Sequence, residues 1–289
     1  MDDFYSPAQR SLSNRFAHWR EQGRRRRSIE INLEGRSPAQ YVNLDKSVDR
    51  PDVFLVPKNK TRSSLLGLHP ANNPYVQTLY ESDQGHQHYT GSAMETHYNH
   101  FQPQSAATVL GLTDGELSKR HPDAAVLPWW AAIDKSILDS MDINQRRLRY
   151  TRPERYGLDE KLDYGCQFYG PVSKGVGELE YQRHIETHQL IKKNGYLPYM
   201  HGHLTGQFLV SENDWVWVCH KGNHRYVSLL RLNLKYIPVA FSSKLGSSVI
   251  VQRKDVERWP NVANDLFSPA EALQIFDRFI SATNSQTTK

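Results

Sequence analysis

Residues 208–241 read FLVSENDWVWVCHKGNHRYVSLLRLNLKYIPVAF, and the order of elements in this stretch decides the fold. Two runs of apolar, β-branched and aromatic residues, 208–210 and 214–220, predict strands joined by a short polar turn. A glycine-containing turn then leads into a predicted helix over about 223–232, and 237–241 predicts a third strand. Strands and a helix that follow each other so closely indicate an α/β (α+β) fold.

The second strand of this stretch has apolar side chains on both faces. Trp215, Trp217 and Cys219 alternate with Val216 and Val218. Successive side chains of a strand point to opposite faces, so both faces of this strand are expected to be covered. We therefore expect a small mixed sheet with flanking helices.

Helices are predicted on either side of this stretch. Residues 178–193 follow a helical period, and Asn194-Gly195 is expected to end that helix. The residues that share its apolar stripe are Tyr181, His184, Ile185, His188 and Ile191. Near the C-terminus, Ser268-Pro269-Ala270-Glu271 is a capping box that predicts the start of another helix.

The N-terminal half has weaker patterns. Short strands are predicted over 29–33 and 53–56, whereas the stretch 57–100 is rich in Asn, Ser, Gly, His and Pro. That composition predicts long loops with little regular structure. We expect two regions: an irregular N-terminal region of residues 1–165 and a C-terminal domain of residues 166–289.

Residues 6–22 predict an amphipathic helix, which Gly23 ends and Arg24, Arg25, Arg26 and Arg27 follow. Two interpretations stay open. The helix docks on the core and the arginines form a solvated turn, or the basic segment makes a weak contact with an anionic surface. The four arginines account for much of the net charge of +5. The charge therefore gives little support for binding to nucleic acid, which stays an open alternative.

Composition indicates a folded, reduced protein. Hydrophobic residues make up 38% of the 289 residues, which is enough for a packed core. The two cysteines, Cys166 and Cys219, lack the paired spacing of a zinc knuckle. No apolar run approaches the roughly 20 residues that span a bilayer. We expect a cytoplasmic protein without a transmembrane segment.

The turn Lys221-Gly222-Asn223-His224-Arg225 carries the predicted chemistry. The start of a helix presents unpaired backbone N–H groups and the positive end of the helix dipole. Glycine lets a phosphate approach the backbone closely, and Lys221, His224 and Arg225 add charge and hydrogen-bond donors. The turn therefore predicts an anion site.

Three motifs in this region resemble those of the ParB/sulfiredoxin superfamily. Residues 191–198, IKKNGYLP, resemble the helix followed by G-x-x-P that opens ParB N-terminal domains. Residues 218–226, VCHKGNHRY, resemble the G-x-x-R box of ParB and the G-C-H-R box of sulfiredoxins. Residues 232–239, LNLKYIPV, are similar to the segment that follows in both. The resemblance covers about residues 178–241.

This resemblance implies binding of ATP or another NTP at the turn, with a small mixed sheet of ParB/sulfiredoxin type. The sequence also departs from the motifs of this superfamily in two places. Asn223 occupies the position of the sulfiredoxin cysteine, so a sulfinic-acid reductase is not expected. Only 48 residues follow residue 241, and they do not resemble the helix-turn-helix domain of partition clamps. The remaining interpretation is a phosphotransferase (a small-molecule kinase) or an NTP hydrolase.

Phosphoryl transfer needs a charge clamp, usually Mg²⁺, and a base that orients the acceptor hydroxyl. The clamp would be the turn, with Arg183 near the place where sulfiredoxins have a phosphate-binding lysine. Candidates for the base are Glu180, Glu186 and Glu178. The acceptor is an unidentified small molecule. Residues 89–103 are expected to pack beside the turn and line its pocket, and the alternative is that they cover another face of the sheet.

Two other functions stay open. His184 and His188 are four residues apart on a helix, so one metal ion could bind both, as in a metal-dependent nuclease or phosphoesterase. Against this, both lie on the apolar stripe of the predicted helix, where histidines with satisfied hydrogen bonds are common in protein cores. A third interpretation is a scaffold that binds a nucleotide without turning it over.

Overall fold

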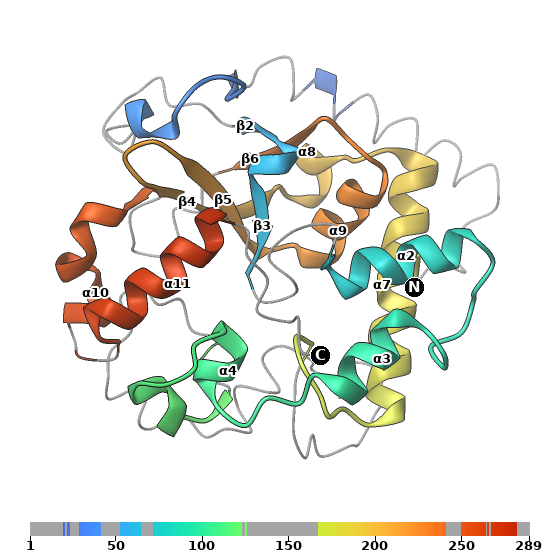
Figure 1. Ribbon diagram of the computed structural model, residues 1–289. Helices are drawn as coiled ribbons and strands as arrows, with labels where there is room; N and C mark the ends of the chain where they lie inside the picture. Colours follow the sequence, from blue (N-terminus) through green and yellow to red (C-terminus); the bar gives the residue numbers. More distant parts are fainter. Residues whose placement is uncertain are drawn as a thin grey trace.

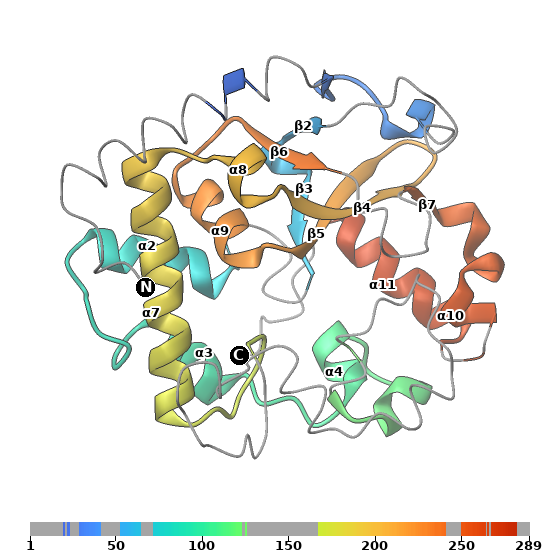
Figure 2. The ribbon, with the colours of Figure 1, turned by 180° about the vertical axis from the view of Figure 1, so that it is seen from behind.

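The computed structural model describes residues 20, 22–23, 29–41, 53–64, 72–122, 125, 167–240, 250–263, 265 and 267–281. One mixed sheet lies at its centre, with helices around it (Figures 1 and 2). The strands are β1 (Glu30–Asn32), β2 (Val53–Pro57), β3 (Thr61–Ser63), β4 (Leu204–Val210), β5 (Trp215–Lys221), β6 (Tyr236–Ala240) and β7 (Ile250–Gln252). The expected α/β (α+β) class is confirmed.

The helices fall into two groups along the chain. Those of the first half are η1 (Pro38–Tyr41), η3 (Lys58–Lys60), α2 (Pro74–Asp83), α3 (Ala93–His100), α4 (Ala106–Leu110) and η5 (Glu116–Lys119). Those of the second half are α7 (Lys174–Asn194), α8 (Pro198–His201), α9 (Asn223–Arg231), η9 (Arg253–Arg258), α10 (Pro260–Ala263) and α11 (Pro269–Ser281).

The sheet has the order β1-β2-β6-β4-β5-β3, and β7 pairs with β4 beside β6. β4 and β5 form an antiparallel hairpin with Phe208 opposite Trp217, which confirms the two strands expected around 208–220. β2 pairs with β6 and β3 pairs with β5. Strands from both sides of the expected boundary near residue 165 thus belong to one sheet, and the boundary itself lies outside the described residues.

Helices cover both faces of the sheet. On one face the ring of Trp217 packs against Tyr226 of α9, with 5.9 Å between the centroids. On the other face Arg62, which is paired with Val218, donates its Nε–H to the carbonyl oxygen of Phe279 in α11 at 2.9 Å. Residues 217 and 218 point to opposite faces, so the expectation that both faces are covered is confirmed.

The helices expected in the second half are present. α7 begins four residues earlier than predicted, because Ser173 caps it by accepting a hydrogen bond from the N–H of Val176. Gly195 ends it with a φ of 77°. α11 begins at Pro269 with the predicted capping box, in which Ser268 and Glu271 exchange hydrogen bonds.

The prediction of long loops over 57–100 is wrong for most of the residues that the structure describes there. Pro74 is the first residue of α2, and Asn73 caps that helix by accepting from two backbone N–H groups. Ser92 caps α3 by accepting a hydrogen bond from the N–H of Glu95. Asn, Pro and Ser are frequent in loops, but here they stand at helix starts, where their side chains and fixed φ stabilise the first turn.

Several expectations concern residues outside the described part of the chain. These are the amphipathic helix over most of 6–22, the basic segment Arg24 to Arg27, and Cys166. Among the described helices, none has the length and apolar character needed to cross a membrane.

Candidate functional site

The predicted phosphate turn joins β5 to α9. Gly222 is the N-cap of α9 and has a φ of 96°, and no side chain at this cap bonds to the first turn. The first backbone N–H groups of α9 therefore keep their capacity to bind an acceptor. The positive end of the helix dipole lies at the same place, which favours an anion.

Glycine is required at position 222 for two reasons. A φ near +96° is strained for residues with a side chain. A Cβ atom there would also lie 2.7 Å from Cδ2 of Leu204 and 3.0 Å from Nη2 of Arg225. The turn thus has little room for a larger residue.

Arg225 folds back across the turn. Its Nη1 donates to the carbonyl oxygens of His201, at 3.1 Å, and of Gly202. The guanidinium therefore fastens the end of α8 to the start of α9. Lys221 is exposed at the end of β5, so it adds positive charge without a fixed position.

A buried carboxylate faces this turn. The Glu180 side chain, on α7, is 2% exposed. Its Oε1 accepts a 2.6 Å hydrogen bond from Nε2 of His224, and its Oε2 accepts a 3.1 Å bond from Nη1 of Arg183. The hydroxyl of Tyr75, on α2, lies 3.5 Å from the same Oε1. Residues of α2, α7 and α9 thus meet at one carboxylate.

Glu180 is held in its charged form. Burial opposes ionisation, but electrostatic attraction to His224, their hydrogen bond and the nearby Arg183 together lower the pKa of Glu180 below its ordinary value. A carboxylate with a lowered pKa accepts hydrogen bonds well and is a weak base.

Aromatic and imidazole rings surround this carboxylate. The ring of His184 lies 4.9 Å from that of Tyr75 and 5.4 Å from that of His224, measured between centroids. Nε2 of His184 lies 2.9 Å from the carbonyl oxygen of Tyr75, which can only accept, so Nε2 carries the proton. Burial lowers the pKa of His184 to about 3, with a contribution from His224. His184 is therefore neutral at pH 7.

The other two predicted glutamates lie elsewhere on α7. Glu178 is exposed and forms a 3.7 Å ion pair with Lys174. Glu186 is exposed and accepts a hydrogen bond from Gln182. Of the three candidates, Glu180 is the one that faces the turn. Its position four residues before His184 places it on the buried stripe of the helix, a signal that the sequence contained.

The two histidines predicted as alternative metal ligands face different partners. His184 donates to the carbonyl of Tyr75, whereas Nε2 of His188 lies 3.5 Å from Oδ2 of Asp83. Asp83 also forms ion pairs with Lys192 and Arg231. Within the described residues there is no group of three or more His, Cys, Asp or Glu side chains that could hold a metal ion. The arrangement gives the metal-dependent alternative little support.

Sequence reasoning missed the contribution of α2. Tyr75 reaches the site because α2 packs against both α7 and α9. Residues 89–103 approach the site through Tyr98, whose hydroxyl lies 2.7 Å from that of Tyr75. That segment is therefore one side chain removed from Glu180, and its role in an acceptor pocket stays a prediction.

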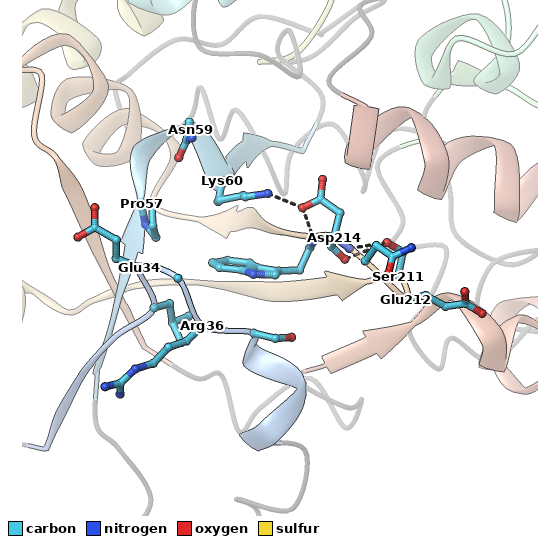
Figure 3. Close-up of a pocket in the computed structure, with 13 residues that line it drawn as sticks. Glu34, Arg36, Pro57, Asn59, Lys60, Ser211, Glu212 and Asp214 are labelled. Atoms are coloured by element: carbon cyan, nitrogen blue, oxygen red, sulfur yellow. Dashed lines mark hydrogen bonds and ion pairs between the residues drawn. The ribbon is translucent and has the colours of Figure 1, made fainter.

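A separate pocket of about 390 Å³ lies at the other end of the β4–β5 hairpin. Figure 3 shows Lys60 turned toward Asp214, and the two form an ion pair beside the ring of Trp215. The wall of this pocket also includes Glu34, Arg36 and Glu212. Because charges of both signs line this pocket, it lacks the positive character of the turn before α9.

The described residues thus join a glycine-containing helix start to a buried carboxylate. Comparison with models of protein families, with characterised proteins and with solved structures finds no match for the chain. The chemistry of these side chains is consequently what supports a function.

Proposed function

We propose that the protein binds a nucleoside triphosphate at the start of α9 and transfers its terminal phosphoryl group to a small hydroxyl compound or to water. One observation carries the proposal. A buried carboxylate, Glu180, is fixed by hydrogen bonds to His224 and Arg183 beside an uncapped helix start. Carboxylates are rarely buried without such partners, and ionisable groups with shifted pKa values, such as Glu180, cluster at functional sites.

The phosphates would bind at Lys221, Gly222, Asn223, His224 and Arg225. The first N–H groups of α9 donate to phosphate oxygens, and Gly222 leaves the backbone open to close approach. Arg183 is 31% exposed on its side chain, so it can hold Glu180 and still face a ligand. The negative charge of the nucleotide is thereby balanced by helix dipole and side chains.

We expect Mg²⁺ to come to the site with the nucleotide. Mg²⁺ in such sites usually binds phosphate oxygens, waters and one or two carboxylates. Both oxygens of Glu180 already accept hydrogen bonds, so the phosphates would provide most of the ligands. When bound, Mg²⁺ neutralises charge on the phosphates and the departing diphosphate.

A thermal-shift screen tests this function. Full-length protein is heated with Mg²⁺ and ATP, ADP, CTP or GTP, and adenosine without phosphates serves as the matched control. A ligand that binds the native state at 100 times its Kd stabilises it by about 2.7 kcal/mol. We expect at least one triphosphate to raise the melting temperature and adenosine to leave it unchanged.

Phosphate release is then measured with the nucleotide that stabilises the protein. We expect slow release of inorganic phosphate that depends on Mg²⁺. If no triphosphate raises the melting temperature, the nucleotide site is wrong. If one binds but neither hydrolysis nor transfer to any offered hydroxyl compound is detected, the protein is a nucleotide-binding scaffold.

A further inference from the structure

We infer that His224 accepts the proton of the attacking hydroxyl, and that Glu180 is a positioning residue that holds the imidazole of His224 in the tautomer this task needs. The inference rests on the proposed function, because it assigns roles within the same site. It gives His224 a chemical role in addition to the phosphate contact expected from the turn.

The tautomer follows from the hydrogen bond between the two side chains. Nε2 of His224 lies 2.6 Å from Oε1 of Glu180. An ionised carboxylate can only accept, so Nε2 carries the proton and Nδ1 of the neutral ring keeps a lone pair. A carboxylate fixes a catalytic histidine in the same manner in Ser-His-Asp hydrolases.

The position of Nδ1 suits a proton acceptor. Nδ1 is bonded to the ring carbon that carries the side chain, so it lies nearer to the backbone of α9 than Nε2 does. His224 is the second residue of α9, and the N–H groups at that helix start are the proposed phosphate ligands. An acceptor hydroxyl aligned with the terminal phosphate would thus meet Nδ1 before it could meet Glu180.

Glu180 itself is poorly placed to accept the proton. It is 2% exposed, and both carboxylate oxygens are engaged. Its lowered pKa also makes it a weak base. The ring of His224 lies between the carboxylate and the helix start, and its side chain is 15% exposed.

Groups from each packed element set the charge around His224. From α7 it faces the Glu180 carboxylate, with the Arg183 cation behind it, and the neutral ring of His184. From α2 it faces the ring of Tyr75, with 6.0 Å between the centroids. On its own side it lies beside the positive helix start. One anion, the Glu180 carboxylate, is therefore opposed by two positive features around His224.

The step balances as follows. The hydroxyl oxygen of the acceptor forms a bond to the terminal phosphorus of the nucleotide. The bond from that phosphorus to the bridging oxygen breaks, and the diphosphate leaves with its electron pair. The hydroxyl proton passes to Nδ1 of His224, and the imidazolium keeps its Nε2–H bond to Glu180. Solvent then removes the proton from Nδ1.

Two matched variants test these roles with Mg²⁺–ATP, or with the triphosphate that the thermal screen selects, and water as the acceptor. His224→Gln keeps a donor to Glu180 but has no basic nitrogen. We expect kcat to fall by a factor on the order of 100 or more, which is larger than any change in nucleotide affinity from the altered phosphate turn. Glu180→Gln should lower kcat less and move the acid limb of the pH–rate profile, whereas exposed Glu186→Gln should change neither. Imidazole added to His224→Gly should restore part of the rate.

A second test does not depend on activity: it measures which nitrogen of His224 carries the proton in the protein without substrate. Nitrogen-15 NMR of labelled histidines should show His224 with the proton on Nε2, and Glu180→Gln should alter that signal. A proton on Nδ1 in the wild type, or full kcat in His224→Gln, would overturn the inference. If NMR shows the expected tautomer of His224 but the protein turns over no triphosphate, the proton-accepting role and the proposed function are both refuted.

Discussion

Replacing Glu180 by alanine is expected to lower the free energy of unfolding by about 3 kcal/mol. The substitution leaves His224 and Arg183 without their carboxylate in a buried environment. Removing one partner of a buried pair typically costs about 3–5 kcal/mol. We expect the lower end of this range because the Arg183 side chain is 31% exposed and water reaches it.

Urea denaturation followed by circular dichroism measures this loss. With an m-value of about 3 kcal/mol/M or less, the midpoint should fall by about 1 M or more. Glu186→Ala, on the exposed face of the same helix, is the matched control and should change stability by no more than about 0.5 kcal/mol. Equal midpoints for the two variants would refute the claim that Glu180 organises the contacts between α7 and α9.

Three further predictions concern histidine and cysteine. The pKa of His184 is about 3 in the folded protein, below its unfolded value, so the unfolded chain binds an extra proton as pH falls below about 6.5. Burial lowers the pKa of other histidines, His220 among them, in the same direction, so the loss of stability between pH 7 and pH 5 in urea titrations should be smaller by about 2 kcal/mol in His184→Gln than in the wild type. Burial raises the pKa of the Cys219 thiol, so it should react with a thiol reagent only after unfolding, and replacing both cysteines by serine should leave any turnover intact. Elemental analysis should find no stoichiometric transition metal, and His188→Leu should still fold, because Asp83 keeps its ion pairs with Lys192 and Arg231.

The elements that sequence reasoning placed correctly have local signals. The β4–β5 hairpin and α9 follow from alternation and a glycine turn within 25 or so residues. The stop of α7 follows from Gly195, and the start of α11 from its capping box. Each of these signals acts over one or two turns of chain, so no knowledge of tertiary contacts was needed.

The parts that could not be predicted depend on contacts between distant segments. β2 and β3 pair with β6 and β5, more than 150 residues away. This pairing brings α2 against α9 and places Tyr75 beside Glu180. Composition assigned that region to loops, although Asn73 and Ser92 mark helix starts. A propensity argument does not carry information on which strands will pair.

Calorimetric titration of Mg²⁺–triphosphate into the wild type and into Arg225→Ala tests the central claim most directly. Arg225 fastens the turn before α9 and adds its charge there. Its loss should weaken binding by about 1.5–3 kcal/mol, or roughly 10- to 150-fold in Kd. Arg253→Ala removes an exposed arginine that pairs with Asp277 instead and should leave Kd unchanged. Equal affinity in wild type and Arg225→Ala would contradict a nucleotide site at this turn.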